Sequence, residues 1–249
     1  MWGGTCFGRV VRRQHHPYWG EKLAERVNRA LAAHLIHPQF ESLGVEPRFI
    51  GIRSLDVRGP NIRAGDHFHV YATRSQPVSF AVDPFEGGSG AIEFGRFCIM
   101  APGVRIRSAV SVKIGDDCMF AENTLITDAD WHDRYHRIYP GECEPVVIED
   151  NVWLCDGVRV CKGVRIGENS IIGVGAIVTR DVPKNTIAAG NPAKPIGELD
   201  PALHSTRRRA LFEGGLPYQA FKDEFDARRL EGNSALGYLR TLLFPSRHD

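Results

Sequence analysis

A period of six residues runs from Ile148 to Val182 and constrains the fold more than any other feature of the chain. Large or branched apolar residues stand at every sixth position, namely Ile148, Leu154, Val160, Ile166, Ile172 and Val178. A second slot, four residues after each of these, holds Val152, Val158, Val164, Ser170, Ala176 and Val182. An α-helix has a period near 3.6 and a strand a period of 2, so neither sustains this pattern. The pattern predicts a β-helix, in which short segments bury their apolar faces by stacking on neighbouring coils.

The same phase, with interruptions, extends the predicted β-helix over residues 50–197. It starts weakly at Ile50 and returns at Phe94. Two insertions, residues 74–91 and 127–146, break it; the first is rich in Gly and Pro, and the second is long, polar and aromatic. We expect both to protrude from the coil as loops. After the regular stretch, a proline-containing segment closes the coil, because proline cannot donate to a strand ladder.

The two ends of the chain, residues 1–49 and 198–249, lack the period and are predicted to be helical. Tyr18–Leu35 carries apolar residues at helical spacing. The row of arginines Arg207–Arg209 is interpreted as a solvated helix face. The apolar stretch Ala235–Phe244 is expected to pack on the body or on a partner subunit, with a membrane surface as the alternative.

Composition excludes several classes of protein. The net charge of +1 gives no reason to invoke a nucleic acid partner or an acidic membrane surface. No apolar run is long enough for an integral membrane segment, and the start lacks the apolar part of a secretory signal. The six cysteines include Cys98, Cys118, Cys155 and Cys161 at small core positions of the repeat, and no CxxC pair occurs. We therefore predict a cytoplasmic protein with reduced thiols and no metal.

The second insertion contains groups suited to proton transfer. Histidine exchanges a proton near neutral pH, and His132 lies in the richest part of this insertion. A neighbouring carboxylate can hold the tautomer of such a histidine, and Asp128, Asp130 and Asp133 are all candidates. Spacing alone does not choose among them. The alternative is that His132 is an exposed loop histidine without a role.

Several sequence features together resemble the left-handed β-helix (hexapeptide-repeat) acyltransferases. They are the hexapeptides, the long histidine-containing loop, Asn151-Val152-Trp153, and Gly190-Asn191-Pro192-Ala193-Lys194 at the close. Within this family the chain is most similar to the sugar O-acetyltransferase branch, which includes polysaccharide-modifying enzymes. The resemblance implies a mainly β fold, a left-handed parallel β-helix with an N-terminal helical segment and a C-terminal helical extension. It also implies a homotrimer with acetyl-CoA in the groove between neighbouring subunits.

The resemblance further implies roles for individual residues. His132 would be the general base that deprotonates an acceptor hydroxyl for direct attack on the thioester. Of the three candidate aspartates, we take Asp130 as its partner. The amide N–H of Asp156 would stabilise the resulting oxyanion. The residues expected to hold the cofactor are Trp153, Gly173, Gly175, Ala176, Arg180, Lys184 and Lys194, the three cations through its phosphates. A carbohydrate acceptor would contact Asn123, Asp133 and Arg134; where the galactoside enzymes have an asparagine, this chain has Ala101.

Three other functions stay open at the level of sequence. In the first, the protein would be an N-acetyltransferase whose acceptor is an amine, as on a nucleotide-linked amino sugar. A γ-class carbonic anhydrase-like metalloprotein would draw on His67, His69, His132 and His136 for zinc. A non-catalytic scaffold would use the flat faces of the coil for assembly.

Overall fold

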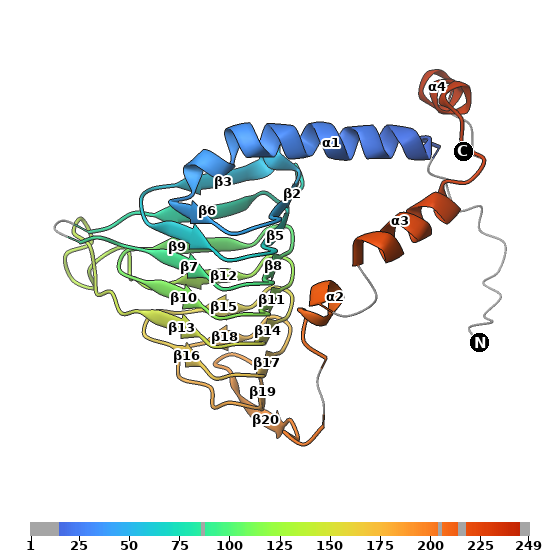
Figure 1. Ribbon diagram of the computed structural model, residues 1–249. Helices are drawn as coiled ribbons and strands as arrows, with labels where there is room; N and C mark the ends of the chain where they lie inside the picture. The colour runs from blue at the N-terminus through green and yellow to red at the C-terminus, as the bar shows by residue number, and fades with distance from the viewer. Residues whose placement is uncertain (1–14, 86–87, 204–205, 214–217, 245–249) are drawn as a thin grey trace. The chain divides into compact units, whose positions relative to one another are not determined.

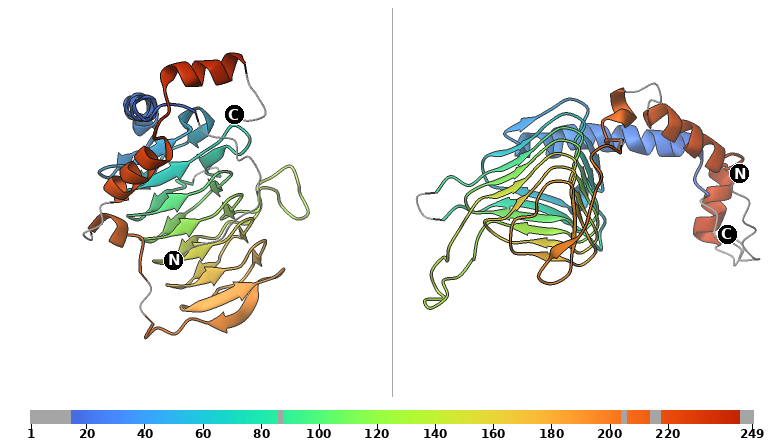
Figure 2. Two further views of the ribbon diagram at one scale, coloured as in Figure 1. Left: turned by 90° about the vertical axis from the view of Figure 1, so that its right-hand side faces the viewer. Right: turned by 90° about the horizontal axis from the view of Figure 1, so that it is seen from below.

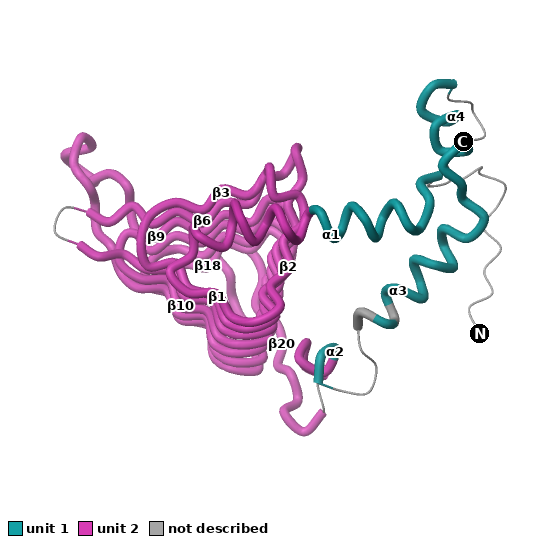
Figure 3. The backbone as a smooth tube through the Cα atoms, turned by 45° about the horizontal axis from the view of Figure 1, so that its top comes forward, with its two compact units in different colours: residues 1–27, 211–249 teal, residues 28–210 magenta. Residues whose placement is uncertain are grey.

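The computed structural model describes residues 15–85, 88–203, 206–213 and 218–244. The chain forms two compact units, which Figure 3 shows in different colours. We call residues 28–210 the β-helix unit, and residues 1–27 together with 211–249 the helical unit.

The β-helix unit consists of three sheets, here called A, B and C, that the chain visits in turn (Figure 1). Sheet A contains β1 (Ser42–Leu43), β4 (Ile62–Ala64), β7 (Ile92–Phe94), β10 (Val112–Ile114), β13 (Val146–Ile148) and β16 (Arg165–Ile166). Sheet B contains β2 (Arg48–Ile50), β5 (His69–Tyr71), β8 (Ile99–Met100), β11 (Met119–Phe120), β14 (Trp153–Leu154), β17 (Ile171–Ile172), β19 (Thr186–Ala189) and β20 (Lys194–Glu198). Sheet C contains β3 (Leu55–Arg58), β6 (Val78–Val82), β9 (Arg105–Ser108), β12 (Leu125–Thr127), β15 (Arg159–Val160) and β18 (Ile177–Val178).

The strands stack in parallel, except that β20 runs antiparallel to β19. Viewed along the stack, the three sheets enclose a triangular section (Figure 2, right). This architecture confirms the predicted fold class, a left-handed parallel β-helix. We name the three edges by the sheets that meet there: the A/B, B/C and C/A corners.

The six-residue period explains the core of this unit. All six anchors from Ile148 to Val178 are at most 1% exposed. One anchor falls on each sheet in turn, so residues 18 apart stack directly, as Ile148 on Ile166 and Leu154 on Ile172 do. Full burial of each such side chain stabilises the fold by about 1.5–3 kcal/mol.

The A/B corner shows how the chain turns between sheets. Asn151, Asn169 and Asn185 occupy the same place in successive coils with φ near +60° (56°, 61° and 56°). Asparagine tolerates this left-handed conformation better than other side chains except glycine. The amides form a ladder, with Nδ2 of Asn151 donating to Oδ1 of Asn169 at 2.9 Å and Nδ2 of Asn169 donating to Oδ1 of Asn185 at 3.1 Å.

The coil differs from the sequence-based prediction in two places. It starts at Ser42, where β1 pairs with β4, and not at residue 50. The expected loop 74–91 contains β6, which pairs with β3 and β9, so the excursion begins only at Asp83. Val78, Phe80 and Val82 alternate as buried residues of this strand. The prolines on either side of the strand made it look like part of a loop.

The helices agree with the prediction from spacing. α1 spans Tyr18–Leu35, as expected, and 3₁₀ turns follow at His37–Gln39 and Ile52–Ser54. The C-terminal part contains α2 (Ala210–Glu213), α3 (Tyr218–Arg229) and α4 (Ala235–Leu243). None of the described helices has the length and apolar character needed to cross a membrane.

The sequence suggested that the row Arg207–Arg209 is a solvated helix face, and the structure shows that it is not. These arginines precede α2 and lie along the A/B corner, where Arg207 pairs with Glu168 and Arg208 donates to Nδ1 of His69 at 2.9 Å. Arg209 donates to the buried carboxylate of Asp117 through its backbone amide and its Nε, both at 2.7 Å. A buried carboxylate requires such a partner, which explains why the segment folds back onto the coil.

Candidate functional site

The insertion after β12 forms a two-stranded ribbon that protrudes at the C/A corner (Figure 1). Ala129 and Cys143 form an antiparallel bridge, and the Asp130 amide donates to the Glu142 carbonyl at 2.8 Å. Nearer the tip, the Asp133 amide donates to the Tyr139 carbonyl at 2.8 Å. We call residues 128–145 the ribbon. Its internal hydrogen bonds give it a defined shape, although it lies outside the core.

His132 is exposed on this ribbon, and its ring is oriented by the backbone. Its Nδ1 lies 2.8 Å from the carbonyl oxygen of Arg137. A carbonyl oxygen only accepts hydrogen bonds, so Nδ1 must carry the proton that it donates. In the neutral ring the lone pair is then on Nε2, directed away from the ribbon backbone. This is the tautomer that a general base requires.

None of the three predicted aspartates holds His132. Asp128 is fully buried at the root of the ribbon, where its carboxylate accepts from the hydroxyl of Ser108 at 2.6 Å and from the amides of Ala109, Val110 and Ser111. It fastens the ribbon to the preceding coil. An acceptor saturated in this way does not turn toward an exposed imidazole.

Asp130, the predicted partner of His132, does not contact it in this structure either. Its carboxylate pairs with Lys162 at 3.1 Å, and Lys162 reaches Glu142 on the other ribbon strand at 2.8 Å. Asp133 accepts from the amides of Tyr135 and His136 at 2.8 and 2.6 Å. These amides hold the pKa of Asp133 below its usual value. The carboxylate of Asp133 thus shapes the ribbon tip, and Arg134 beside it is exposed.

The B/C corner brings together five other predicted residues. Asn123, Asp156 and the segment Gly173–Ala176 lie in the turns that join sheet B to sheet C in successive coils. The Gly157 amide donates to the Glu122 carbonyl, and the Gly175 amide donates to the Asp156 carbonyl, both at 2.8 Å. These turns are therefore stacked directly on one another.

Three successive turns at this corner each leave one amide without an acceptor in the described part of the chain. Among the described residues, the amide N–H of Asp156 has no acceptor, and neither have the equivalent amides of Glu122 and Val174. The fold thus provides a column of free donors. The position of the catalytic base, and not the turn itself, would decide which of them meets an oxyanion.

The outer face of sheet B continues from this corner as an apolar surface. Trp153 is 42% exposed between Met119 and Ile171 in the neighbouring strands. Beside this column runs a second one of small residues, which consists of Ala101, Ala121, Cys155, Gly173 and Ala189. A Cβ added to Gly173 would lie 2.9 Å from the Cβ of Ala189, so this track has no room for larger side chains there. A flat track bordered by free amides suits an extended amide-containing chain such as pantetheine.

The three predicted phosphate-binding cations do not come together in one chain. Arg180 follows β18 at the C/A corner, and Lys184 lies at the A/B corner against Gly167. Lys194 pairs with Ala189 in β20, next to the B/C corner. All three are exposed. Of these, only Lys194 lies beside the track on sheet B.

His132 and the B/C corner are also separated within one chain. Sheet C lies between them, since β12 begins just after Asn123 and ends at the root of the ribbon. At about 3.3 Å per residue, the seven steps from Asn123 to Asp130 span on the order of 20 Å. The expectation that Trp153 and Asp156 face His132 is therefore not met inside a single chain.

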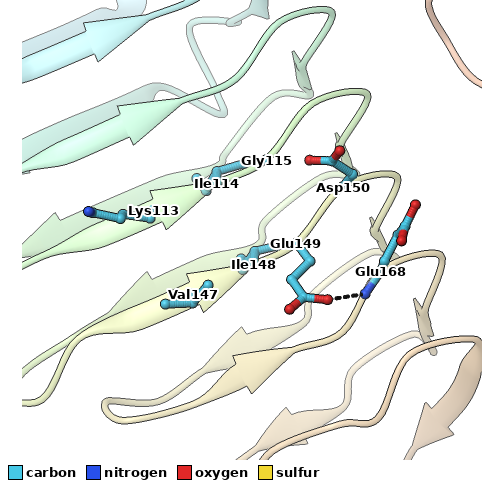
Figure 4. A pocket seen from close by; sticks show the side chains of 8 residues that line it. All are labelled: Lys113, Ile114, Gly115, Val147, Ile148, Glu149, Asp150 and Glu168. Carbon is cyan, nitrogen blue, oxygen red and sulfur yellow. Dashed lines mark hydrogen bonds between the residues drawn. The ribbon is translucent and has the colours of Figure 1, made fainter.

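A groove on sheet A is lined by carboxylates that are engaged in contacts with their neighbours. It has a volume of about 380 Å³ and is lined by Lys113, Ile114, Gly115, Val147, Ile148, Glu149, Asp150 and Glu168 (Figure 4). Its carboxylates are all engaged. Glu149 accepts from the amide of Glu168 at 2.8 Å and pairs with Arg165, Asp150 accepts from the Asp116 amide at 2.8 Å, and Glu168 pairs with Arg207.

The histidines considered for zinc lie at different corners. His67 stacks on Phe97 at the A/B corner with 5.1 Å between ring centroids, whereas His132 and His136 are in the ribbon. Burial, and then the charge of Arg208, lower the pKa of His69 to about 3, so its ring is neutral and accepts from Arg208. In the described part of the chain, no group of three or more His, Cys, Asp or Glu side chains is placed to hold a metal ion.

Comparison with known proteins identifies the family. Residues 145–180 match the family model "Bacterial transferase hexapeptide (six repeats)". The chain is 35% identical over 141 residues to the putative lipopolysaccharide biosynthesis O-acetyl transferase WbbJ of Escherichia coli, and this alignment covers 52% of the chain and 69% of WbbJ. The chain belongs to the hexapeptide-repeat acyltransferase family. The resemblance inferred from sequence is thereby confirmed.

Two further relatives show how far this similarity extends. Galactoside O-acetyltransferase of Escherichia coli is 37% identical over 93 residues, which cover 36% of this hexapeptide-repeat chain and 45% of the enzyme. The chain thus spans less than half the length of that relative. A crystal structure of a variant of AntD, an N-acyltransferase from Bacillus cereus, matches with a TM-score of 0.53 at 13% identity and covers 78% of this chain and 94% of AntD. That match supports the fold.

Sequence reasoning missed three contributors to the site. The carbonyl of Arg137, which orients His132, is a backbone group and leaves no trace in the residue type. Lys162 lies one coil beyond the ribbon and joins both of its strands. Arg107 lies one coil before the ribbon and contacts it through Trp131. The only signal in the sequence for Lys162 and Arg107 is their spacing: each lies about one coil away from the ribbon, and residues one coil apart stack on one another.

Proposed function

We propose that this protein transfers an acetyl group from acetyl-CoA to a hydroxyl of a sugar or polysaccharide precursor. The tautomer of His132 carries this proposal, because it leaves Nε2 free to accept the proton of an acceptor hydroxyl. Family membership and the O-acetyltransferases among the relatives support the same reaction. The proposal requires no metal and no covalent enzyme intermediate.

The cofactor would lie along the track on sheet B and the B/C corner. When bound, acetyl-CoA supplies a thioester carbonyl that is open to attack. Trp153 and the small residues ending at Gly173 and Ala189 would bind its pantetheine arm, with Gly175 and Ala176 contributing backbone. Lys194 would meet a phosphate, whereas Arg180 and Lys184 take this role only for a cofactor shared with another chain. The Asp156 amide would donate to the oxyanion as negative charge develops.

The separation of His132 from the B/C corner supports a composite site. A ribbon that protrudes at one corner can place its histidine against the B/C corner of a second copy. We therefore propose that the protein acts as a homotrimer, whose cyclic contacts repeat one heterologous interface between neighbours. Asn123 and Arg134 would then approach the acceptor from different subunits. The cytoplasmic location stays a prediction.

The decisive experiment follows thiol release from acetyl-CoA with a panel of hydroxyl sugars and amino sugars. We expect release that depends on a hydroxyl acceptor, and a loss of kcat of at least about 10²-fold in His132→Ala, since general base catalysis contributes 10²–10⁴. Acetyl-CoA binding should be retained, because the base acts in the transition state. His136→Ala, a change on the same ribbon, is the matched control. Full turnover by His132→Ala, or release with amino sugars alone, would refute the proposal.

A further inference from the structure

The ribbon that carries His132 is clamped to sheet C through the neighbouring residue, Trp131. The guanidinium carbon of Arg107 lies 3.5 Å from the centroid of the Trp131 ring, which is a close cation–π stack. The indole Nε1 donates to Oγ1 of Thr127 at 3.1 Å. Arg107 and Thr127 are register partners on adjacent strands β9 and β12. Trp131 is therefore held flat against two coils at once.

The first insertion supplies the other half of this clamp. The Nε of Arg107 donates to the carboxylate of Asp83 at 2.9 Å, and this second contact fixes the orientation of the guanidinium plane that stacks on Trp131. Phe85, two residues further, meets the Trp131 ring edge to face with 5.5 Å between centroids. Both insertions protrude from the same corner of the coil (Figure 2). The first insertion thus packs against the second.

We infer that Arg107 is a positioning residue for His132, acting through Trp131. This inference rests on the proposed function of His132 as a base. His132 follows Trp131 directly in the chain. Because the orientation of the Trp131 indole and its distance from sheet C are fixed, the position of the His132 backbone is restricted. The hydrogen bond from Nδ1 of His132 to the Arg137 carbonyl then determines only the orientation of the imidazole ring within the ribbon. Without the clamp the ribbon keeps that bond and its attachments through Asp128 and Lys162, but Trp131, and with it His132, is held less firmly against sheet C.

The contacts of Arg107 distinguish it from its neighbour on the same strand. Arg105 lies two residues earlier on the same outer face of β9 and is likewise exposed. Among the described residues the guanidinium of Arg105 has no hydrogen-bond or ion-pair partner, whereas that of Arg107 has Asp83 and Trp131. Substitution of either arginine removes one positive charge from this face, but only substitution of Arg107 removes the contacts with Asp83 and Trp131. Comparing the two substitutions therefore separates the effect of these contacts from the effect of charge.

The test compares Arg107→Met, Arg107→Lys and the control Arg105→Met. We expect Arg107→Met to lower kcat about tenfold with the KM for acetyl-CoA unchanged, because small misplacements of a catalytic group cost this much or more. Arg107→Lys should recover part of the loss, since it keeps the cation but not the planar stack. Arg105→Met should match the wild type. In the His132→Ala background, Arg107→Met should have no further effect, as expected for a residue that acts through His132.

A second readout does not depend on activity. Amide hydrogen exchange in the ribbon, followed at Asp133 and Tyr139, should be faster in Arg107→Met than in Arg105→Met. Unchanged exchange would overturn the clamp, and an equal loss of kcat with and without His132 would overturn its action through that residue. If the wild type shows no acetyl transfer while exchange responds as expected, the clamp stands and the proposed function fails.

Discussion

At the scale of single residues, backbone groups carry as much of the proposed chemistry as side chains do. The tautomer of His132 depends on the carbonyl of Arg137, and the oxyanion donor is an amide. The donor amide, that of Asp156, lies in the turn Cys155–Val158, and the geometry of this turn allows the amide to be removed by substitution. Gly157 has φ of 69° and the Val158 amide lies 3.4 Å from the Cys155 carbonyl, the geometry of a turn that favours proline at its second position.

Proline at this second position removes only the N–H. Pro102 already occupies the equivalent place two coils earlier, before Gly103 with φ of 79°. We expect Asp156→Pro to lower kcat about 10²–10³-fold, as loss of one oxyanion donor does, with little change in thermal stability. Asp156→Ala and Glu122→Pro should stay close to the wild type, and Val174→Pro, which removes an amide beside the proposed pantetheine track, should change the KM for acetyl-CoA and not kcat. Steady-state kinetics and thermal unfolding of the four variants decide it; an active Asp156→Pro protein would exclude this amide as the donor.

At the scale of elements, each insertion and extension is fastened by a few charged contacts. The ribbon has Lys162 across its strands, and the segment before α2 has Arg209 on Asp117. Within the helical unit, Glu25 of α1 receives Lys222 of α3 at 2.6 Å and Lys22 at 3.1 Å. Such contacts replace the regular stacking that holds the coil, because these elements have no repeat on which to stack.

The packing of α1 on α3 should therefore depend on pH. Burial alone would raise the pKa of Glu25, but the hydrogen bonds from Lys222 and Lys22 outweigh it and lower this pKa to about 2. Because the pKa in the folded state is below the ordinary value of 4.5, ionised Glu25 stabilises the packing above about pH 4.5, and the effect is lost as the pH falls toward 2. Hydrogen exchange in α3 should accelerate over this window in the wild type. Glu25→Gln should show faster exchange already at neutral pH and a weaker pH dependence.

At the scale of the whole molecule, the proposed site needs more than one chain. Sheet C separates the His132 ribbon from the B/C corner of the same chain. Each active site would then combine the ribbon of one subunit with the corner of its neighbour. The apolar outer face of sheet B, with Trp153 partly exposed, is the surface that such a neighbour would cover.

Subunit mixing tests this arrangement. His132→Ala and Asp156→Pro chains, each expected to be nearly inactive alone, are unfolded together, refolded and assayed. Random assembly of trimers should restore about a quarter of the wild-type sites, because one neighbour pair in four combines an intact histidine with an intact amide. Sites confined to one chain would give no recovery. Size-exclusion chromatography with light scattering checks that the mixed protein is a trimer.

The sequence by itself determined the coil, because a period of six has one structural solution and its anchors report burial directly. Ile148 to Val178 were identified as core residues on this ground, and α1 was located to the residue by helical spacing. The histidine and its ribbon were also visible, since a long polar insertion stands out against a regular repeat. Patterns that depend on residues near in sequence are legible in this way.

Only the tertiary structure decided which partners these residues have. Asp130 lies two positions from His132 yet pairs with Lys162, and Arg209 reaches Asp117 across 92 positions. Arg105 and Arg107 look alike in sequence, and the contact of Arg107 with Trp131 depends on how the ribbon folds over sheet C. Hydrogen bonds and ion pairs act over a few ångströms in space. Residues brought that close by the winding of the coil carry no common mark along the chain.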